Sequence, residues 1–240
     1  MTVAVVIPAL DEELSIGEAV RQARAISGVY EVVVCDNGSR DDTAARARTA
    51  GARVITEPQR GYGRACLAAL ADLAARPPHT VLFMDADLAD DPADAPALLA
   101  PIRSGQADMV IGSRIERAES GALLPQARFG NWLATRLLRM LFGVEYTDLG
   151  PFRAIRWQAL QMLAMDDEDF GWTVQMQARA ARRGLRATEV PVQYHRRVGR
   201  SKISGTVVGS IRAGTKIIST LMAERLAARS AVSKEAAQAV

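Results

Sequence analysis

Several residue types and patterns are scarce in this chain, and each absence narrows what it can be. Among 240 residues there are only two cysteines, Cys35 and Cys66, and two histidines, His79 and His195. Two cysteines are too few for a disulfide scaffold, and together with two histidines they are too few for a structural zinc site. Any divalent metal must therefore bind to oxygen atoms. No apolar run approaches the ~20 residues of a membrane span, and the first residues lack the three parts of a signal peptide. We therefore expect a cytoplasmic protein.

Charge is small overall but unevenly distributed. The chain is 49% apolar and 24% charged, which excludes intrinsic disorder and allows a buried core. Residues 1–178 hold 17 basic and 24 acidic side chains, whereas residues 179–240 hold 13 and 3. A basic C-terminal quarter suits phosphates, anionic lipid or nucleic acid, and it is equally compatible with a solvated surface.

The first half alternates short apolar runs with helical patterns. Strands are predicted at Val3–Ile7, Glu31–Cys35, Arg53–Thr56, Thr80–Met84 and Asp108–Ile111. Helices are predicted at Leu14–Ile26, Thr43–Ala50 and Gly61–Ala75, and another begins at Asp91-Pro92. Such alternation predicts an α/β fold with a mostly parallel sheet and helices on both faces.

Polar side chains follow three of the predicted strands. They are Asp11 and Glu13 after the first, Asp36 and Asn37 after the second, and Asp85 and Asp87 after the fourth. Ligands of open α/β sheets bind outside the carboxyl ends of the strands, so these side chains predict one shared site. A single carboxylate there could be a helix cap, but three acidic strand ends favour ligand binding.

The triplet Asp85-Ala86-Asp87 is the most informative of these patterns. Two carboxylates at i and i+2 beyond a buried strand can face one crevice, and hard oxygen ligands suit Mg²⁺ or Mn²⁺. A bound cation would stabilise a departing nucleotide diphosphate. The triplet alone is common by chance, and its position after a strand gives it weight.

Several ordered motifs together resemble family 2 glycosyltransferases of the GT-A fold, a Rossmann-like architecture. The chain most resembles the branch that transfers hexoses to polyprenyl or dolichyl phosphate. The motifs are Val6–Glu13, Cys35–Ser39, Asp41–Thr43, Asp85–Asp87, Gly112–Arg114, Thr147–Ile155, Gly171-Trp172, Glu189–Val192 and Arg200–Ser204.

The resemblance implies a role for particular residues. Those implied to bind the nucleotide sugar are Pro8, Ala9, Asp11, Glu13, Asp36, Arg60, Gly61, Asp85, Ala86, Asp87, Arg200, Ser201 and Lys202. Asp36 would receive the base, and Asp87 with Asp85 would hold the metal. Arg114 would contact a phosphate of donor or acceptor, and the loop around Lys202 would close over the diphosphate, as an Arg/Lys pair in a Gly/Ser-rich segment also suggests.

The resemblance implies an inverting hexosyltransferase that uses a nucleotide-diphospho-sugar of the UDP-glucose or GDP-mannose type. Its acceptor would be a polyprenyl phosphate or, alternatively, a soluble hydroxyl. A hydroxyl needs a general base, and the candidates are Asp148 and Asp169, with Glu168 beside the latter; an anionic phosphate needs none. Two departures matter: Ala89 stands where phosphate-acceptor members of the family often have a further polar metal ligand, and Gln175 stands where relatives commonly have glutamate.

Two amphipathic segments bear on the acceptor. Trp132–Phe142 and Val207–Leu226 have apolar residues at helical spacing, with arginines or lysine among them. Either segment could lie at a membrane surface or pack on the domain or a second copy, so a homo-oligomer and peripheral attachment to the inner membrane face are both open. We place the catalytic domain at residues 1–205 and an amphipathic helix with a tail at 206–240.

Three other classes fit less well. Gly61-Tyr62-Gly63 lacks the third glycine of a dinucleotide-binding oxidoreductase and does not follow the first strand. A nucleotidyltransferase would have a glycine-rich basic loop after its first strand. A nucleic-acid binder would explain the basic C-terminal quarter, but not the acidic strand ends, and no aromatic residues are interleaved there. We therefore expect no nucleic-acid partner.

Overall fold

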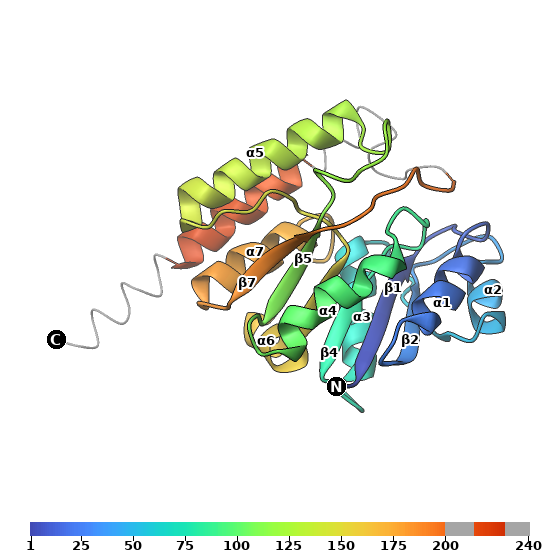
Figure 1. The fold of residues 1–240 in the computed structure, drawn as a ribbon. Helices are drawn as coiled ribbons and strands as arrows, with labels where there is room; N and C mark the ends of the chain where they lie inside the picture. The colour runs from blue at the N-terminus through green and yellow to red at the C-terminus, as the bar shows by residue number, and fades with distance from the viewer. Residues whose placement is uncertain (200–213, 229–240) are drawn as a thin grey trace.

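One seven-stranded sheet organises the chain, of which the computed structural model describes residues 1–199 and 214–228 (Figure 1). The strand order is β3-β2-β1-β4-β6-β5-β7. The strands are β1 Val3–Ala9, β2 Val29–Asp36, β3 Arg53–Thr56, β4 Thr80–Phe83, β5 Met109–Ser113, β6 Arg153–Arg156 and β7 Ala187–Pro191. All five predicted strands are present, with ends that differ by at most two residues.

Helices connect the strands and cover both faces of the sheet. They are α1 Ile16–Ala25, α2 Thr43–Thr49, α3 Tyr62–Leu73, the 3-10 turn η1 Pro92–Asp94, α4 Ala95–Arg103, α5 Pro125–Phe142, α6 Trp157–Leu163 and α7 Trp172–Arg182. The predicted start at Asp91-Pro92 is confirmed, since the Asp91 carboxylate accepts a hydrogen bond from the Ala93 amide (2.9 Å).

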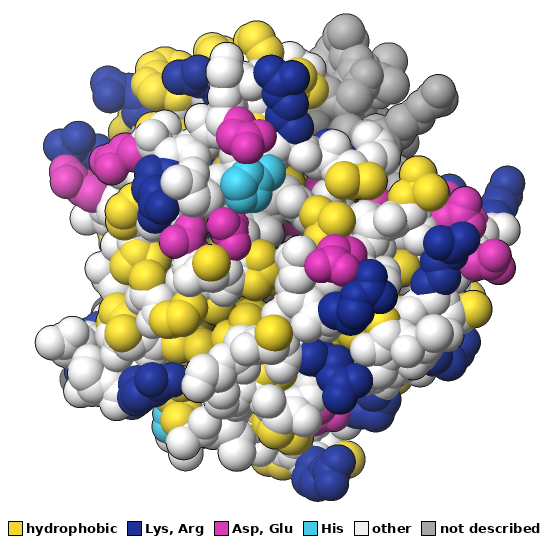
Figure 2. All heavy atoms as spheres, turned by 45° about the vertical axis from the view of Figure 1, so that its right-hand side comes forward, with side chains coloured by type: hydrophobic (Ala, Val, Ile, Leu, Met, Phe, Trp, Pro, Cys, Tyr) yellow, Lys and Arg dark blue, Asp and Glu magenta, His cyan; other side chains and the backbone are white. Residues whose placement is uncertain are grey.

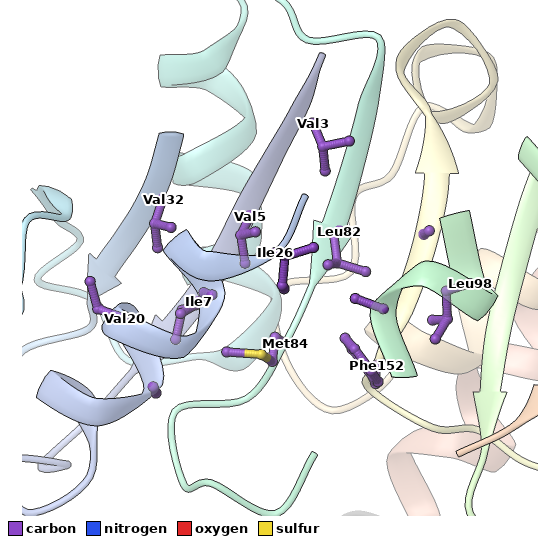
Figure 3. Packing of buried hydrophobic residues seen from close by; sticks show 14 of the residues in the cluster. Val3, Val5, Ile7, Val20, Ile26, Val32, Leu82, Met84, Leu98 and Phe152 are labelled. Atoms are coloured by element: carbon purple, nitrogen blue, oxygen red, sulfur yellow. The ribbon is translucent and has the colours of Figure 1, made fainter. Parts of the chain in front are cut away.

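Alternate residues of β1 pack into two separate hydrophobic cores, one on each face of the sheet. Val3, Val5 and Ile7 pack with α1 and α4 on one face of the sheet, where Leu82, Met84 and Phe152 join them (Figure 3). Ala4 and Val6 face the other way, toward α3, α6 and α7. Each β1 residue from Val3 to Ile7 is fully buried, as expected of a central parallel strand covered on both sides. The prediction of an α/β fold with helices on both faces is confirmed.

Strand β6 was not predicted, and it is the one antiparallel member of the sheet. It lies between β4 and β5 and runs against both. Its first residue, Arg153, is completely buried, and the guanidinium donates to the carbonyl oxygens of Leu149, Gly150 and Thr173. These bonds replace water at the charged group and fix the turn that precedes β6.

A third, smaller core joins α5 and α7 to a C-terminal helix spanning residues 214–228. Leu138 of α5, Val174 of α7 and Leu221 of the C-terminal helix are fully buried together. The predicted helix at Val207–Leu226 is thus present from residue 214, while the proposed domain boundary at 205/206 lies outside the described residues. Within residues 1–199 and 214–228, no helix has both the length and the apolar content needed to cross a membrane.

Candidate active site

A cavity of about 570 Å³ opens at the carboxyl ends of β1, β2 and β4. Ten of the residues predicted from the sequence line it, namely Pro8, Ala9, Asp11, Asn37, Arg60, Gly61, Asp85, Ala86, Asp87 and Asp169. The structure therefore brings together residues that lie up to 161 positions apart in the chain. The site occupies the position that open α/β sheets use for ligands.

The turn after β1 is tied to the loop after β2. Asp11 adopts a positive φ of 49°, and its carboxylate accepts a hydrogen bond from the Arg40 amide (2.8 Å). The Glu13 carboxylate accepts from the Asp42 amide (3.3 Å) and does not line the cavity. Asp11 therefore faces the cavity from a turn that hydrogen bonds to the loop after β2 hold in place, and Glu13 makes one of these bonds.

Asn37 organises the wall that carries Arg60 and Gly61. Its side-chain amide donates to the carbonyls of Glu57 (3.0 Å) and Gln59 (2.8 Å), and its oxygen accepts from the Gly61 amide (2.8 Å). The neighbouring Asp36 is 7% exposed and does not line the cavity. Its buried Oδ1 atom has no hydrogen-bond partner within the described part of the chain.

Three carboxylates gather after β4. Asp85, which lines the cavity, accepts a hydrogen bond from the Tyr62 hydroxyl (3.2 Å), and its amide donates to Asp90 (3.2 Å). Burial and the neighbouring charge of Asp87 raise the pKa of Asp85 to about 7. Burial, together with Asp85 and Asp87, also raises the pKa of Asp90. Burial is the larger cause of both shifts, and the neighbouring carboxylates add to it.

This acidic cluster suits a hard divalent cation that binds together with a phosphate ligand. Asp90 keeps one buried oxygen, Oδ1, without a partner among the described residues. Those residues contain no group of three or more His, Cys, Asp or Glu side chains arranged to hold a metal alone. Mg²⁺ and Mn²⁺ sites with one or two carboxylates are completed by water and substrate phosphates. The donor set fits a cation held by Asp85 and Asp87.

Two arginines flank the acidic cluster in different ways. Arg197 lines the cavity, and its Nη2 atom lies 3.2 Å from Asp87 Oδ2 and 3.5 Å from Glu12 Oε1. Arg114 instead pairs with Asp148 and stacks over the Tyr194 ring, 5.0 Å from its centroid. Neither Arg114 nor Asp148 lines the cavity.

The Asp148 carboxylate is fully engaged by its neighbours. It is 0% exposed and accepts bonds from the Arg114 amide, Nε and Nη2 (2.8, 2.7 and 2.7 Å) and from the Leu149 amide (2.8 Å). Burial would raise its pKa, but the charge and hydrogen bonds of Arg114 hold that pKa below the usual range. The arrangement positions the Arg114 guanidinium, and it leaves Asp148 turned away from the cavity.

The acidic segment Asp166–Asp169 packs between α3 and the C-terminal helix. The Asp167 carboxylate accepts from the Asp169 amide and from the Thr220 hydroxyl, and it lies 3.0 Å from Lys216 Nζ. A Cβ atom at Gly63 would overlap the Asp167 carbonyl oxygen, so α3 can approach this closely only with glycine there. Asp169, at the end of the segment, reaches the cavity.

The comparisons with known proteins decide the family. Residues 4–163 match the family model of glycosyl transferase family 2, which covers more than half of the chain. The chain belongs to glycosyl transferase family 2.

Relatives of this family 2 glycosyltransferase are named for different activities. It is 39% identical over 211 residues to an uncharacterized glycosyltransferase of Mycobacterium tuberculosis, covering 87% of this chain and 93% of the relative. It is 34% identical over 225 residues to a dolichyl-phosphate hexose transferase of Haloferax volcanii, covering 93% and 95%. Glucosyl-3-phosphoglycerate synthase of M. tuberculosis, solved with Mn²⁺, UDP and glucosyl-3-phosphoglycerate, is 25% identical with a TM-score of 0.74, over 93% and 79%.

Several cavity residues of this glycosyltransferase were not predicted. Tyr62 and Phe170 are aromatic neighbours of predicted positions, and Arg197 belongs to the basic run that begins at His195. That basic run was the signal in the sequence that could have pointed to Arg197 as a cavity residue. Of the predicted residues, Arg200, Ser201 and Lys202 lie outside the described residues. Gln175 is buried away from the cavity, where it accepts from the Asp167 amide and donates to Glu224.

Proposed function

We propose that this glycosyltransferase transfers a hexose, with inversion, from a nucleotide-diphospho-sugar to a polyprenyl phosphate. The observation that carries the donor half of the proposal is the pair of carboxylates, Asp85 and Asp87, that line the cavity just beyond β4. The Mn²⁺ and UDP in the solved glucosyl-3-phosphoglycerate synthase support the same assignment. Both the glucose and mannose donors, with UDP or GDP, remain within the proposal.

Asp85 and Asp87 would hold the divalent cation, with Asp87 the more direct ligand. When bound, the cation would neutralise charge that develops on the departing diphosphate. Arg60 and Arg197 line the same cavity and would bind the phosphate oxygens, since guanidinium groups match phosphate geometry. Asp36 would receive the base only after a shift that opens its buried Oδ1 atom to the cavity beside Asn37.

The acceptor half of the proposal rests on the surroundings of the candidate bases. Asp148 is held by Arg114, and Gln175 lies outside the cavity, which leaves Asp169 as the candidate carboxylate that reaches it. A phosphate oxygen is already anionic at neutral pH and needs no base, and it would pair with a guanidinium such as that of Arg114. The likeness to the dolichyl-phosphate hexose transferase agrees with this acceptor.

A soluble phosphorylated acceptor is the second candidate, because the fold also matches glucosyl-3-phosphoglycerate synthase. The test is a transfer assay with labelled UDP-glucose and GDP-mannose, each offered to undecaprenyl phosphate in detergent and to 3-phosphoglycerate. The proposal expects metal-dependent product from the lipid acceptor. Transfer to 3-phosphoglycerate alone would support the second candidate, and no transfer of either sugar to either acceptor would contradict the proposal.

A further inference from the structure

Helix α5 presents apolar side chains outward. Phe129, Trp132 and Met140 are 63%, 56% and 68% exposed, and the rings of Phe129 and Trp132 lie 5.8 Å apart. On its inner side the helix buries Ala134 and Leu138 in the third core. Large exposed side chains clustered on one helix face mark an interaction surface.

The C-terminal helix at 214–228 also presents apolar side chains outward. Ile218, Met222 and Leu226, spaced four residues apart, are 40%, 49% and 59% exposed. The two helices lie side by side at one end of the molecule, and Leu138 of α5 and Leu221 share their common core (Figure 1). We call the exposed surface of both helices, defined by Phe129, Trp132, Met140, Ile218, Met222 and Leu226, the two-helix face.

The charges around the two-helix face are mostly basic, and the exposed Glu145 just after α5 pairs with Arg139 (3.0 Å). Residues 125–142 include three arginines, Arg128, Arg136 and Arg139, and no acidic residue. The acidic residue of the C-terminal helix, Glu224, is 5% exposed and pairs with Arg179 (2.6 Å) and Arg182. At the level of α5, the view in Figure 2 shows hydrophobic and basic side chains together at the top of the molecule.

We propose that the two-helix face docks on an anionic phospholipid surface. Aromatic and aliphatic side chains can enter the headgroup boundary while Arg128 and Arg136 reach the lipid phosphates. A symmetric contact between two copies would instead set this mostly basic face against an identical one, where the exposed acidic side chain beside α5, Glu145, is already paired with Arg139 (3.0 Å). Charge complementarity therefore favours anionic lipid over a second copy.

A short chain of hydrogen bonds links this face to the candidate site. Asn131 of α5 donates to the Thr147 carbonyl (2.8 Å) and accepts from the Leu149 amide (2.9 Å). The residue between them, Asp148, holds Arg114. Asp148, which positions Arg114, would thus lie in a segment held by hydrogen bonds from the helix that docks on the membrane. Only this link rests on the proposed lipid acceptor; the docking itself does not.

The test uses the full chain, without sugar donor or acceptor, in co-sedimentation with vesicles of phosphatidylcholine alone or mixed with phosphatidylglycerol. The matched variants are F129S/W132S/M140S for the apolar part, R128Q/R136Q for the basic part, and M162S as a control on α6, where Met162 is 53% exposed. Each variant is checked for an unchanged thermal midpoint. Light scattering reports the oligomeric state.

We expect binding to phosphatidylglycerol vesicles with a blue shift of tryptophan emission, and weaker binding at high salt. The triple serine variant should lose it, R128Q/R136Q should weaken it about thirtyfold, and M162S should bind as wild type. Equal binding to phosphatidylcholine, no binding by folded wild type, or a stable dimer disrupted by the triple variant would overturn the proposal. Because no sugar is present, these outcomes are independent of the transfer assay.

Discussion

Arg197 and Asp87 form an ion pair across the cavity, with Nη2 3.2 Å from Oδ2. The carboxylate proposed to hold the cation is therefore already neutralised in part by the protein itself. Arg197 also lies 3.5 Å from Glu12, so one guanidinium spans the ends of the β1 and β4 segments. A cation that binds Asp87 must compete with this guanidinium.

Removing the competitor should strengthen binding of the metal alone. We expect Arg197→Ala to raise the affinity for Mn²⁺, without nucleotide, by about two- to fivefold, the size of a partly exposed ion pair. Isothermal titration calorimetry measures the affinity of each variant for Mn²⁺. Arg196→Ala is the matched control, because that side chain donates to the Ser120 carbonyl instead. Weaker Mn²⁺ binding by Arg197→Ala alone would show that Arg197 does not compete.

Protons should compete with the cation at Asp85. Its pKa is raised to about 7 by burial and by Asp87, and only the ionised carboxylate can bind a cation. Affinity for Mn²⁺ should therefore fall below pH 7 and be about tenfold lower at pH 6 than at pH 8. In Asp85→Asn this pH dependence should disappear from whatever Mn²⁺ binding remains. Titrations that give the same affinity at both pH values in the wild type would contradict the assignment.

The Asp148–Arg114 pair should act on stability as well as activity. Asp148→Asn leaves a buried guanidinium without its carboxylate, which should cost about 3–5 kcal/mol in the free energy of unfolding. Urea denaturation measures this loss. The exposed pair Arg139–Glu145 is the control, and Glu145→Gln should change stability by less than about 1 kcal/mol. Full stability of Asp148→Asn would contradict this account of the pair.

The close approach of α3 to the acidic segment can be tested with two glycines. At Gly63 a new Cβ would overlap the Asp167 carbonyl, so Gly63→Ala should destabilise the protein by about 1–3 kcal/mol. At Gly130, within α5, nothing lies within 4 Å, and Gly130→Ala should stabilise by about 0.5–1 kcal/mol. The two changes in the free energy of unfolding, measured by urea denaturation, should have opposite signs. Stabilisation by both substitutions would show that helix propensity, not the contact, decides.

The sheet was predictable because its strands are short apolar runs that end at turn-forming residues. The antiparallel β6 escaped prediction because it has four residues, two of them arginines, and Arg153 is buried by carbonyl contacts from separate segments. The polar residues that follow these strands likewise predicted most of the residues that line the cavity. Arg197 and the engagement of Asp148 by Arg114 were not predictable, since each depends on pairing between distant residues that no local pattern reveals.

The most direct test of the account is Mn²⁺-dependent binding of the nucleotide sugar by Asp87→Asn. Calorimetry with UDP-glucose and GDP-mannose, with and without Mn²⁺, should show metal-dependent binding of one donor in the wild type. Asp87→Asn should lose that binding and all transfer while it stays folded. Asp91→Asn, which changes a carboxylate on the same loop that caps η1 and lies 3.4 Å from His195 Nε2, should retain both. Normal donor binding and turnover by Asp87→Asn would contradict the central claim.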